Sequence, residues 1–190
     1  MRKIRIVAIC GSLRHASYNK RLMYALGAMM QGSGAEMVYL DLLEYQLPLF
    51  NQDIIKEFGV PHELLQMRDI VAKADGLLVV SPEYCGSITG VLKNAIDWLS
   101  ISLSKEERIY SLFSGKPMAA AVATTSKVVG GSKGGEHIRG IASTMGAIMI
   151  PHIMVLHDAA HVDIESLEHV KVFAADIVAF MKVFCKLGDK

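Results

Sequence analysis

The stretch that decides the fold is KIRIVAIC at positions 3–10, which runs directly into GSLRHASYN at positions 11–19. The run is rich in β-branched residues and the glycine that follows ends it, so we expect a buried strand over 3–10. Short apolar runs recur at 36–40, 76–81, 117–124 and 147–150. The sequence therefore predicts five strands.

Helical patterns separate these strands. Apolar residues at helical spacing predict helices over 19–31, 61–73, 90–100, 136–145 and 165–187, and we expect 42–59 to be irregular. Because the strands are continuously apolar, both faces of the sheet must be buried, which is typical of a parallel sheet between helices. The right-handed crossover rule leaves few topologies. We expect an α/β fold with a doubly wound five-stranded sheet of order 2-1-3-4-5.

Composition excludes several classes of protein. The 190 residues are 52% hydrophobic and 21% charged, so we expect one domain over residues 1–190 and no intrinsic disorder. Twenty basic and nineteen acidic residues give a net charge of +1. That balance argues against a nucleic acid or a membrane surface as a partner bound through bulk charge. The first apolar run is too short for a signal peptide, and no run of roughly 18 apolar residues predicts a membrane span.

The cysteines and histidines give no pattern of a metal site. Cys10, Cys85 and Cys185 are far apart and form no CxxC pair, which favours a reducing, cytoplasmic setting. Three histidines and two aspartates follow the last predicted strand, but their spacing matches no compact zinc pattern. These five, which we assign to a polar loop, are His152, His157, Asp158, His161 and Asp163.

The loop at 11–19 follows the first strand, beside the point where the strand order reverses and a ligand crevice is expected. Hydroxyl groups, the Asn19 amide and the N–H groups of a helix start can converge there on an anion, and Arg14 adds a planar charged donor. Neither a Walker nor a GxGxxG sequence is present, so the loop suits the single phosphate of a mononucleotide. The alternative is that Ser17 or Asn19 only caps the helix, with Arg14 in solvent.

The loop after the third strand reads SPEYCGSITG at 81–90 and leads into VLKNAIDW at 91–98. Such a loop can present backbone N–H groups to the edge of a flat heteroaromatic ring, along which Tyr84 can lie. The alternative is a turn followed by an amphipathic helix. We expect Trp98 to belong to the core, and Lys93, Asn94 and Asp97 to fix the helix or a subunit contact.

Together, GSLRxxSxN at 11–19 and SPEY…GxLKNAIDW at 81–98 resemble the NADPH-dependent FMN reductase family. That flavodoxin-like family includes bacterial quinone, chromate and azo-dye reductases, and the resemblance runs from residue 4 to about 150. It implies FMN as cofactor and NADPH or NADH as co-substrate. The implied reaction passes a hydride to flavin N5 and then electrons to a flavin, quinone, azo or similar small-molecule acceptor, by ping-pong, with no catalytic side chain.

The resemblance also implies the cofactor-binding residues. On the first loop they are Ser12, Arg14, Ser17, Tyr18 and Asn19, around the phosphate. Beside the isoalloxazine ring they are Pro82, Glu83, Tyr84, Cys85, Gly86 and Ser87. The segment TTSKVVGG at 124–131 is similar to the family's Ser/Gly-rich flavin loop and adds Thr124, Ser126 and Gly130.

Two positions depart from the family pattern, which usually has Asn at Cys85 and Pro at Thr89. If the loop uses backbone N–H groups toward the flavin, losing the Asn side chain is tolerable. If it uses the side chain itself, the flavin potential or the choice of acceptor should differ. Cys85 can be a redox thiol or a small filler, and we favour the filler because free cysteine usually behaves as a small hydrophobe.

The family further implies a homodimer or homotetramer with the flavin crevice near the subunit boundary. Our candidates for the contact are the helix at 90–100 and the segment 42–59, whose LPLF at 47–50 could cover a neighbouring flavin. The alternative function is a non-enzymatic flavodoxin-like electron carrier or FMN-binding redox sensor. The near-neutral charge favours the enzyme, because small carriers are often strongly charged to steer docking.

Overall fold

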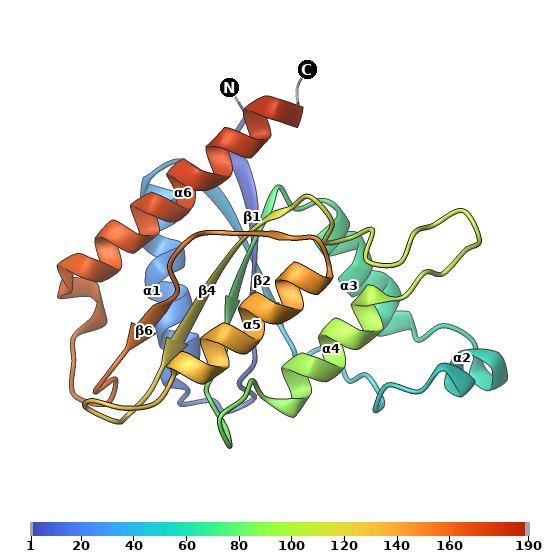
Figure 1. Cartoon of the computed structure of the whole chain (residues 1–190), viewed down its shortest axis with the longest axis horizontal. Coiled ribbons are helices and arrows are strands. Elements are labelled where there is room, and N and C mark those ends of the chain that lie inside the picture. Colours follow the sequence, from blue (N-terminus) through green and yellow to red (C-terminus); the bar gives the residue numbers. More distant parts are fainter. Residues whose placement is uncertain (1, 189–190) are drawn as a thin grey trace.

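The structure is a computed structural model that describes residues 2–188, with side chains described as far as residue 184. Its centre is a parallel sheet of order β2-β1-β3-β4-β5, and a sixth strand, β6, also pairs with β4 (Figure 1). The strands are β1 (Ile4–Cys10), β2 (Ala35–Asp41), β3 (Gly76–Val80), β4 (Pro117–Ala123), β5 (Ile148–Met149) and β6 (Met154–Leu156). The expected order 2-1-3-4-5 is confirmed.

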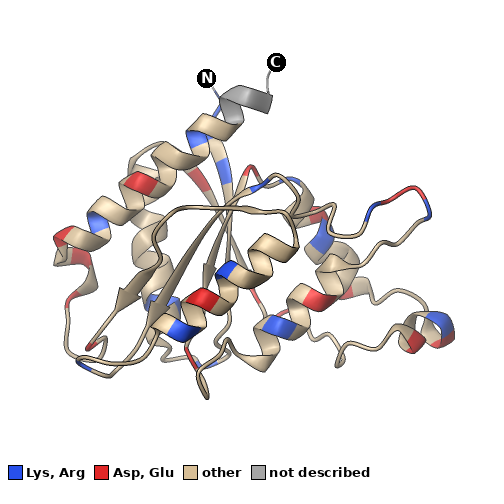
Figure 2. Cartoon of the chain, viewed as in Figure 1, with Lys and Arg blue, Asp and Glu red and all other residues tan. Residues whose placement is uncertain are grey.

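Helices cover both faces of the sheet and create two cores. On one face, Ile6 and Ala8 of β1 pack in a core with α1 (Tyr18–Gly32) and α6 (Glu168–Gly188). On the other face, Val7 and Ile9 pack in a core with α3 (His62–Ala72), α4 (Gly90–Ser100) and α5 (Ser132–Thr144). This double burial is the reason why the inner strands β3 and β4 are continuously apolar, whereas the edge strand β2 contains the exposed Glu36. Charged residues lie mostly on the helices and connections (Figure 2).

The outer edge of the sheet differs from the single strand expected over 147–150. β5 pairs with Pro117 and Met118 at the start of β4, whereas β6 pairs with residues 121–123 at its end. Pro151 stands between the two short strands and has no N–H to donate. The edge strand is therefore interrupted at this proline and resumes after it.

The segment 42–59, here called the arm, was expected to be irregular, and that expectation was wrong for its second half. It contains the short helix α2 (Gln52–Phe58), capped by Asn51, whose Oδ1 accepts from the Asp53 N–H at 2.9 Å. None of the residues of α2 is buried, so the sequence carries no amphipathic pattern that would indicate a helix there.

Two side chains of α4 hold the arm against the body. The Trp98 indole N–H and the Asn94 amide donate to the Pro48 carbonyl at 2.8 and 2.9 Å. Asn94 Oδ1 accepts from the Phe50 N–H at 2.7 Å. Trp98 is fully buried, which confirms its place in the core. Asn94 was expected to fix its helix or a subunit contact, and within the chain it holds the arm instead.

The C-terminal part completes the layer over α1. A 3₁₀ turn at Ile164–Ser166 precedes α6, which begins three residues later than predicted. α5 begins at Ser132 rather than at 136, and its first turn includes Gly134 and Gly135, which are poor helix formers in a sequence. A Cβ on Gly135 would lie 2.8 Å from Ile153 Cγ2. None of the helices within residues 2–188 has the length and apolarity to cross a bilayer.

Candidate functional site

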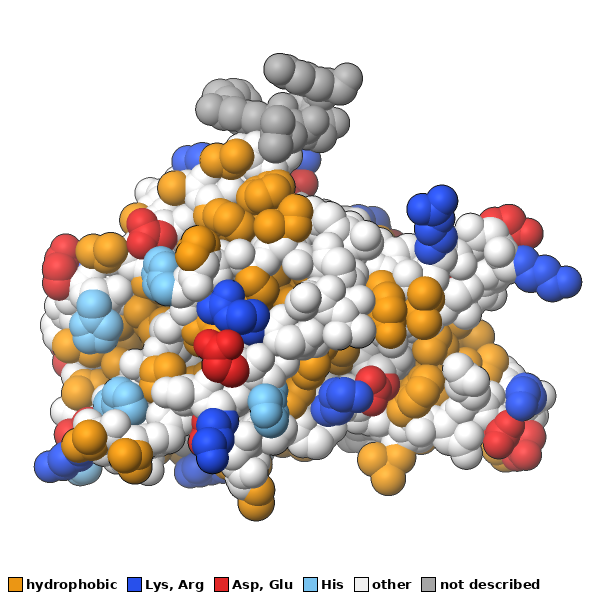
Figure 3. All heavy atoms as spheres, viewed as in Figure 1, with side chains coloured by type: hydrophobic (Ala, Val, Ile, Leu, Met, Phe, Trp, Pro, Cys, Tyr) orange, Lys and Arg blue, Asp and Glu red, His pale blue; other side chains and the backbone are white. Residues whose placement is uncertain are grey.

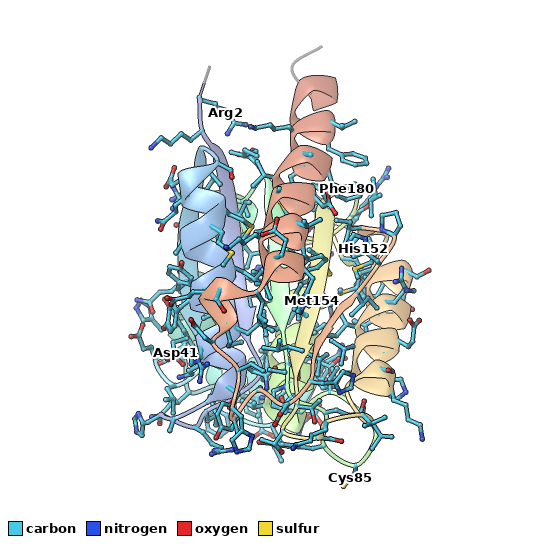
Figure 4. The ribbon with its side chains drawn as sticks, turned by 90° about the vertical axis from the view of Figure 1, so that its left-hand side faces the viewer. Arg2, Asp41, Cys85, His152, Met154 and Phe180 are labelled. Atoms are coloured by element: carbon cyan, nitrogen blue, oxygen red, sulfur yellow. The ribbon has the colours of Figure 1, made fainter. Side chains whose placement is uncertain are left out.

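Three loops leave the carboxyl ends of parallel strands and meet at one end of the sheet (Figure 1). We call residues 11–17 the first loop, 81–89 the second loop and 124–131 the third loop. They follow β1, β3 and β4 respectively. Figure 4 shows Cys85 of the second loop at this end of the molecule and Arg2 at the opposite end. The three loops that were predicted to surround a crevice thus lie at the same end of the sheet.

The first loop presents hydrogen-bond donors at the start of α1. Ser12 and Ser17 are buried, whereas Arg14 is exposed and able to reach a ligand. Ser17 is the N-cap, and its Oγ accepts from the Lys20 N–H at 3.2 Å, so the capping alternative is confirmed for this residue. The first turn of α1 contains no acidic residue, so the positive end of the helix dipole is uncompensated. Hydroxyls, a guanidinium and this helix end together fit a phosphate group.

Asn19 has a structural partner. Its side chain is buried, its Nδ2 donates to the Ala123 carbonyl at 2.9 Å, and its Oδ1 accepts from the Ala123 N–H at 2.8 Å. The amide therefore holds the start of α1 against the end of β4. Its contact with a flavin phosphate stays a prediction, as does that of its half-buried neighbour Tyr18.

Lys20 and Asp41 form an ion pair beside the first loop that the sequence did not reveal. Lys20 Nζ lies 2.6 Å from Asp41 Oδ2, and Lys20 is buried. Burial alone would raise the pKa of Asp41, but hydrogen bonds from Lys20 and the Leu43 N–H hold that pKa below its ordinary value. A lysine on the buried face of a predicted helix was the signal available in the sequence.

The second loop contains a tight hairpin at its tip. The Tyr84 N–H donates to the Ser87 carbonyl at 2.9 Å, and the Ser87 N–H donates to the Tyr84 carbonyl at 3.0 Å. Between them Cys85 has φ 52° and Gly86 has φ 73°, the positive values of a type I′ turn. Asn-Gly is the preferred pair for this turn, which gives a backbone reason for the asparagine typical of the family. Cys85 is exposed (Figure 4), and the choice between a redox thiol and a small filler beside the flavin stays a prediction.

The second loop is anchored to α5 by two side chains. Glu83 Oε2 accepts from the Gly134 N–H at 2.8 Å, in the first turn of α5. His137 Nδ1 lies 2.9 Å from Ser87 Oγ. Pro82 is buried at the base of the loop. The Glu83 carboxylate therefore positions the second loop. Because that carboxylate is occupied, the backbone of Glu83 is the group that can make the predicted contact with a flavin.

The third loop is folded by its own hydroxyl groups. Thr124 Oγ1 accepts from the Ser126 N–H at 3.2 Å, and Ser126 Oγ accepts from the Val129 N–H at 3.1 Å. Gly130 has φ +92°, a conformation that glycine adopts without strain. A Cβ on Gly131 would lie 2.6 Å from Val155 Cγ1, so glycine is required there. The third loop thus lies beside the expected crevice. The contact of Thr124, Ser126 and Gly130 with the cofactor stays a prediction.

A hydrogen bond joins the first loop to the second. Thr89, in the second loop, donates from Oγ1 to the Gly11 carbonyl at 2.6 Å. The same oxygen accepts from the Leu92 N–H at 3.4 Å and so caps α4. A threonine directly before a predicted helix start indicates a cap, but no sequence pattern indicates the hydrogen bond to Gly11.

The residues around the third loop include one unsatisfied nitrogen. His157 follows β6, and its Nδ1 is buried without a hydrogen-bond partner in the described part of the chain. The neighbouring Asp158 N–H donates to the Ser126 carbonyl at 2.9 Å. An orphaned polar atom beside the crevice is consistent with a polar ligand there. Within residues 2–184, no group of three or more His, Cys, Asp and Glu side chains could hold a metal ion.

Comparison with known proteins agrees with this geometry. The family model for NADPH-dependent FMN reductases matches residues 4–161. The chain belongs to this family. It is 34% identical to a 2-hydroxy-1,4-benzoquinone reductase of Burkholderia sp. over 162 residues, which are 84% of this chain and 82% of that protein.

Two solved structures have folds similar to that of this FMN reductase. The flavoenzyme NAD(P)H:(acceptor) oxidoreductase of Paracoccus denitrificans superposes with a TM-score of 0.78 at 24% identity, over 95% of this chain and 98% of that one. A flavodoxin from the domain Archaea superposes with a TM-score of 0.64 at 14% identity, over 94% and 99% of the two chains. The flavodoxin-like fold is thereby confirmed.

Family membership also confirms the expected chemistry. The protein is an oxidoreductase that uses FMN and a reduced nicotinamide nucleotide. The enzyme is favoured over the electron carrier or redox sensor, because the matching family is one of reductases.

Proposed function

We propose that this FMN reductase passes electrons from NAD(P)H to small aromatic acceptors, quinones among them, at the crevice formed by the three loops. The observation that carries this proposal is that all three loops carry exposed apolar side chains, which we call the apolar rim. Its members are Leu13 of the first loop, Tyr84 of the second, and Val128 and Val129 of the third. Exposed apolar side chains gathered around a crevice mark a binding site for an apolar partner.

The first loop would hold the phosphate of FMN. Arg14 offers a charged donor, Ser12 and Ser17 offer hydroxyls, and the helix dipole of α1 adds positive potential. Tyr18 and Asn19 lie beside them at the helix start. Bound there, FMN supplies the redox chemistry, accepting electrons from the nicotinamide and giving them to the acceptor.

The second loop would present backbone donors to the edge of the flavin ring. The Tyr84 N–H is already bonded to the Ser87 carbonyl, so the N–H groups of Glu83, Cys85 and Gly86 are the donors that we assign to the ring. Such fixed donors stabilise negative charge without having to reorient. Pro82 and Ser87 complete the loop, and Thr124, Ser126 and Gly130 would close the site from the third loop.

The apolar rim also bears on the sequence in which the two substrates bind. Leu13, Tyr84 and the two valines are exposed on loops at the same end of the sheet, and we infer that the nicotinamide and the acceptor use the same space there in turn. Both are flat rings that bury apolar area against these side chains. A shared opening predicts ping-pong kinetics. The similarity to a protein named 2-hydroxy-1,4-benzoquinone reductase supports a quinone as the acceptor.

We also propose a homodimer or homotetramer in which the arm makes subunit contact. Pro48 and Phe50 are fixed by Asn94, and Leu49 between them is 83% exposed. Phe58 of α2 is exposed as well. Figure 3 shows apolar side chains at the surface on this side of the molecule, near α4. Light scattering at micromolar concentration should give an oligomer, and a monomer would contradict this contact.

Two further expectations complete the proposal. We assign residues 1–190 to one domain, because the two cores share a single sheet. We assign the protein to the cytoplasm, because its cysteines form no CxxC pair and Cys10 and Cys85 are free.

The proposed function is tested by a visible spectrum followed by turnover. The purified protein mixed with FMN should show a bound flavin spectrum, and anaerobic NADPH or NADH should bleach it. Adding benzoquinone should restore the colour and sustain NAD(P)H consumption. A bound flavin that NAD(P)H does not reduce would contradict the enzyme and favour the carrier.

A further inference from the structure

We propose that the Thr89 hydroxyl is a positioning group that fixes the distance between the first and second loops, and so allows FMN to contact both loops at once. This inference rests on the proposed binding of FMN at the crevice. Thr89 is not expected to touch the cofactor, and it acts through the backbone of Gly11.

The contact between the loops is short and buried. Thr89 is 4% exposed, and its Oγ1 donates to the Gly11 carbonyl at 2.6 Å. A Cβ on Gly11 would lie 2.8 Å from that Oγ1 and 2.7 Å from Ser81 Oγ. Glycine at position 11 therefore lets the two loops approach closely enough for the hydrogen bond to form.

The hydrogen bond also sets the orientation of the peptide between Gly11 and Ser12. In a trans peptide the carbonyl and the N–H point in opposite directions. Thr89 holds the Gly11 carbonyl on the α4 side, so the Ser12 N–H points away from α4. The Gly11 N–H donates to the Val80 carbonyl at 2.8 Å. The start of the first loop is thus held by hydrogen bonds to β3 and to the Thr89 hydroxyl.

The backbone of Thr89 is already compatible with the proline typical of the family. Its φ is −69° and its ψ is 149°, values that proline adopts without strain. Its N–H lies 3.5 Å from Ser81 Oγ, so replacing that N–H removes only a weak contact. In this chain Thr89, whose hydroxyl donates to the first loop, occupies the position at which the family usually has the rigid ring of proline.

This geometry makes different predictions for FMN and for riboflavin. FMN contacts the first loop through its phosphate and the second loop through its ring, whereas riboflavin lacks the phosphate. A bond that holds the two loops at a fixed distance lowers the ordering cost only for a ligand that contacts both. Loss of the Thr89 hydroxyl should therefore weaken FMN more than riboflavin.

The test compares three variants of the apoprotein by quenching of flavin fluorescence. Thr89→Val has nearly the same shape without the hydroxyl, Thr89→Ser keeps the hydroxyl, and Thr89→Pro keeps the backbone angle. We expect Thr89→Val and Thr89→Pro to lower the affinity for FMN about three- to tenfold, the range for one neutral hydrogen bond. Their affinity for riboflavin should change less than about twofold, and Thr89→Ser should match the wild type for both flavins.

The ratio of the two affinities distinguishes positioning from a general effect on folding. Equal weakening of FMN and riboflavin, or an unchanged ratio in both hydroxyl-free variants, would overturn the inference. Circular dichroism checks folding, and should Thr89→Val not fold, Thr89→Pro provides the comparison. A wild-type protein that binds neither flavin would instead remove the proposed function, which separates the two failures.

Discussion

Asn19 and Ala123 hydrogen-bond to each other in both directions although 104 positions separate them in the chain. The amide of Asn19 pairs with the last residue of β4 as a neighbouring strand would. The start of α1 is thereby fixed beside the start of the third loop. Two of the loops that we assign to FMN are held together in this way by the protein's own hydrogen bonds.

Replacing Asn19 by alanine should destabilise the protein. Asn19→Ala leaves the buried N–H and carbonyl of Ala123 without partners, and we expect the free energy of unfolding to fall by about 2–4 kcal/mol. Urea unfolding of the apoprotein measures this change. Gln31→Ala, at an exposed amide of the same helix, should change it by less than about 0.5 kcal/mol. Equal effects of the two substitutions would show that the pair with Ala123 contributes little.

Removing the guanidinium of Arg14 should weaken the binding of FMN. We expect Arg14→Ala to cost about 1–3 kcal/mol of binding free energy, as for the loss of a charged hydrogen bond to phosphate. Riboflavin should bind this variant as it binds the wild type. Arg108→Ala is the matched control, because Arg108 is exposed in the connection between α4 and the start of β4, at the other end of the sheet. Unchanged affinity for FMN in Arg14→Ala would remove Arg14 from the site.

The hairpin at the tip of the second loop should prefer asparagine to cysteine. Cys85 has φ 52°, and asparagine tolerates this left-handed conformation better than most residues. We expect Cys85→Asn to raise the free energy of unfolding by about 0.5–1 kcal/mol. The β-branched variant Cys85→Val should lower it. Thermal unfolding of both apoproteins measures the changes, and the same sign for both would contradict the type I′ turn as the cause.

The two cysteines that the structure describes should differ sharply in reactivity. Burial raises the pKa of the Cys10 thiol to about 11, so Cys10 stays protonated and unreactive near neutral pH. Cys85 is exposed. In a Cys185→Ser background, Ellman's reagent should label one thiol rapidly at pH 8 and the second only after unfolding. Rapid labelling of two thiols in the folded protein would contradict the burial of Cys10.

The Lys20–Asp41 ion pair should make stability depend on acidity. Hydrogen bonds from Lys20 and Leu43 outweigh burial and lower the pKa of Asp41 in the folded protein. A lowered carboxyl pKa stabilises the fold above the unfolded value, and this contribution is lost as the pH falls through the folded value. Asp41→Asn should therefore be less stable than the wild type at pH 7, and the difference should shrink below about pH 4.

Asp53→Asn provides the control for this pH dependence. Asp53 also pairs with a lysine, Lys56, but both side chains are mostly exposed, and such pairs contribute little to stability. Urea unfolding at pH 7 and at lower pH values measures both variants. A difference between the wild type and Asp41→Asn that does not change with pH would contradict the ionised state of Asp41 as its cause.

The strand order could be predicted, and with it the meeting of the three loops at one end of the sheet, because strands buried on both faces are apolar along most of their length. β3 is an unbroken apolar run and β1 is interrupted only by Arg5, and the loops rich in Ser, Gly and Pro follow them. In a doubly wound sheet this placement is enough to locate the crevice. The interrupted edge was missed because β6 has three residues, too few to form a recognisable pattern. The helix α2 was missed because none of its residues is buried.

The connections between the loops could not be read from the sequence. Thr89 and Gly11 are 78 positions apart, and their contact depends on the register of three strands and on the absence of a side chain at Gly11. The carboxylate of Glu83 was expected beside the flavin, and its partner in the first turn of α5 became visible only in the fold. Residue types predict which chemistry a loop can offer, whereas the partner of each side chain depends on tertiary packing.

The interruption at Pro151 affects how the outer edge of the sheet meets other molecules. The edge consists of strands of two and three residues on either side of a residue without an N–H. Chains associate edge to edge through longer, uninterrupted strands. The break should therefore protect newly made or partly unfolded molecules from aggregating through this side of the sheet.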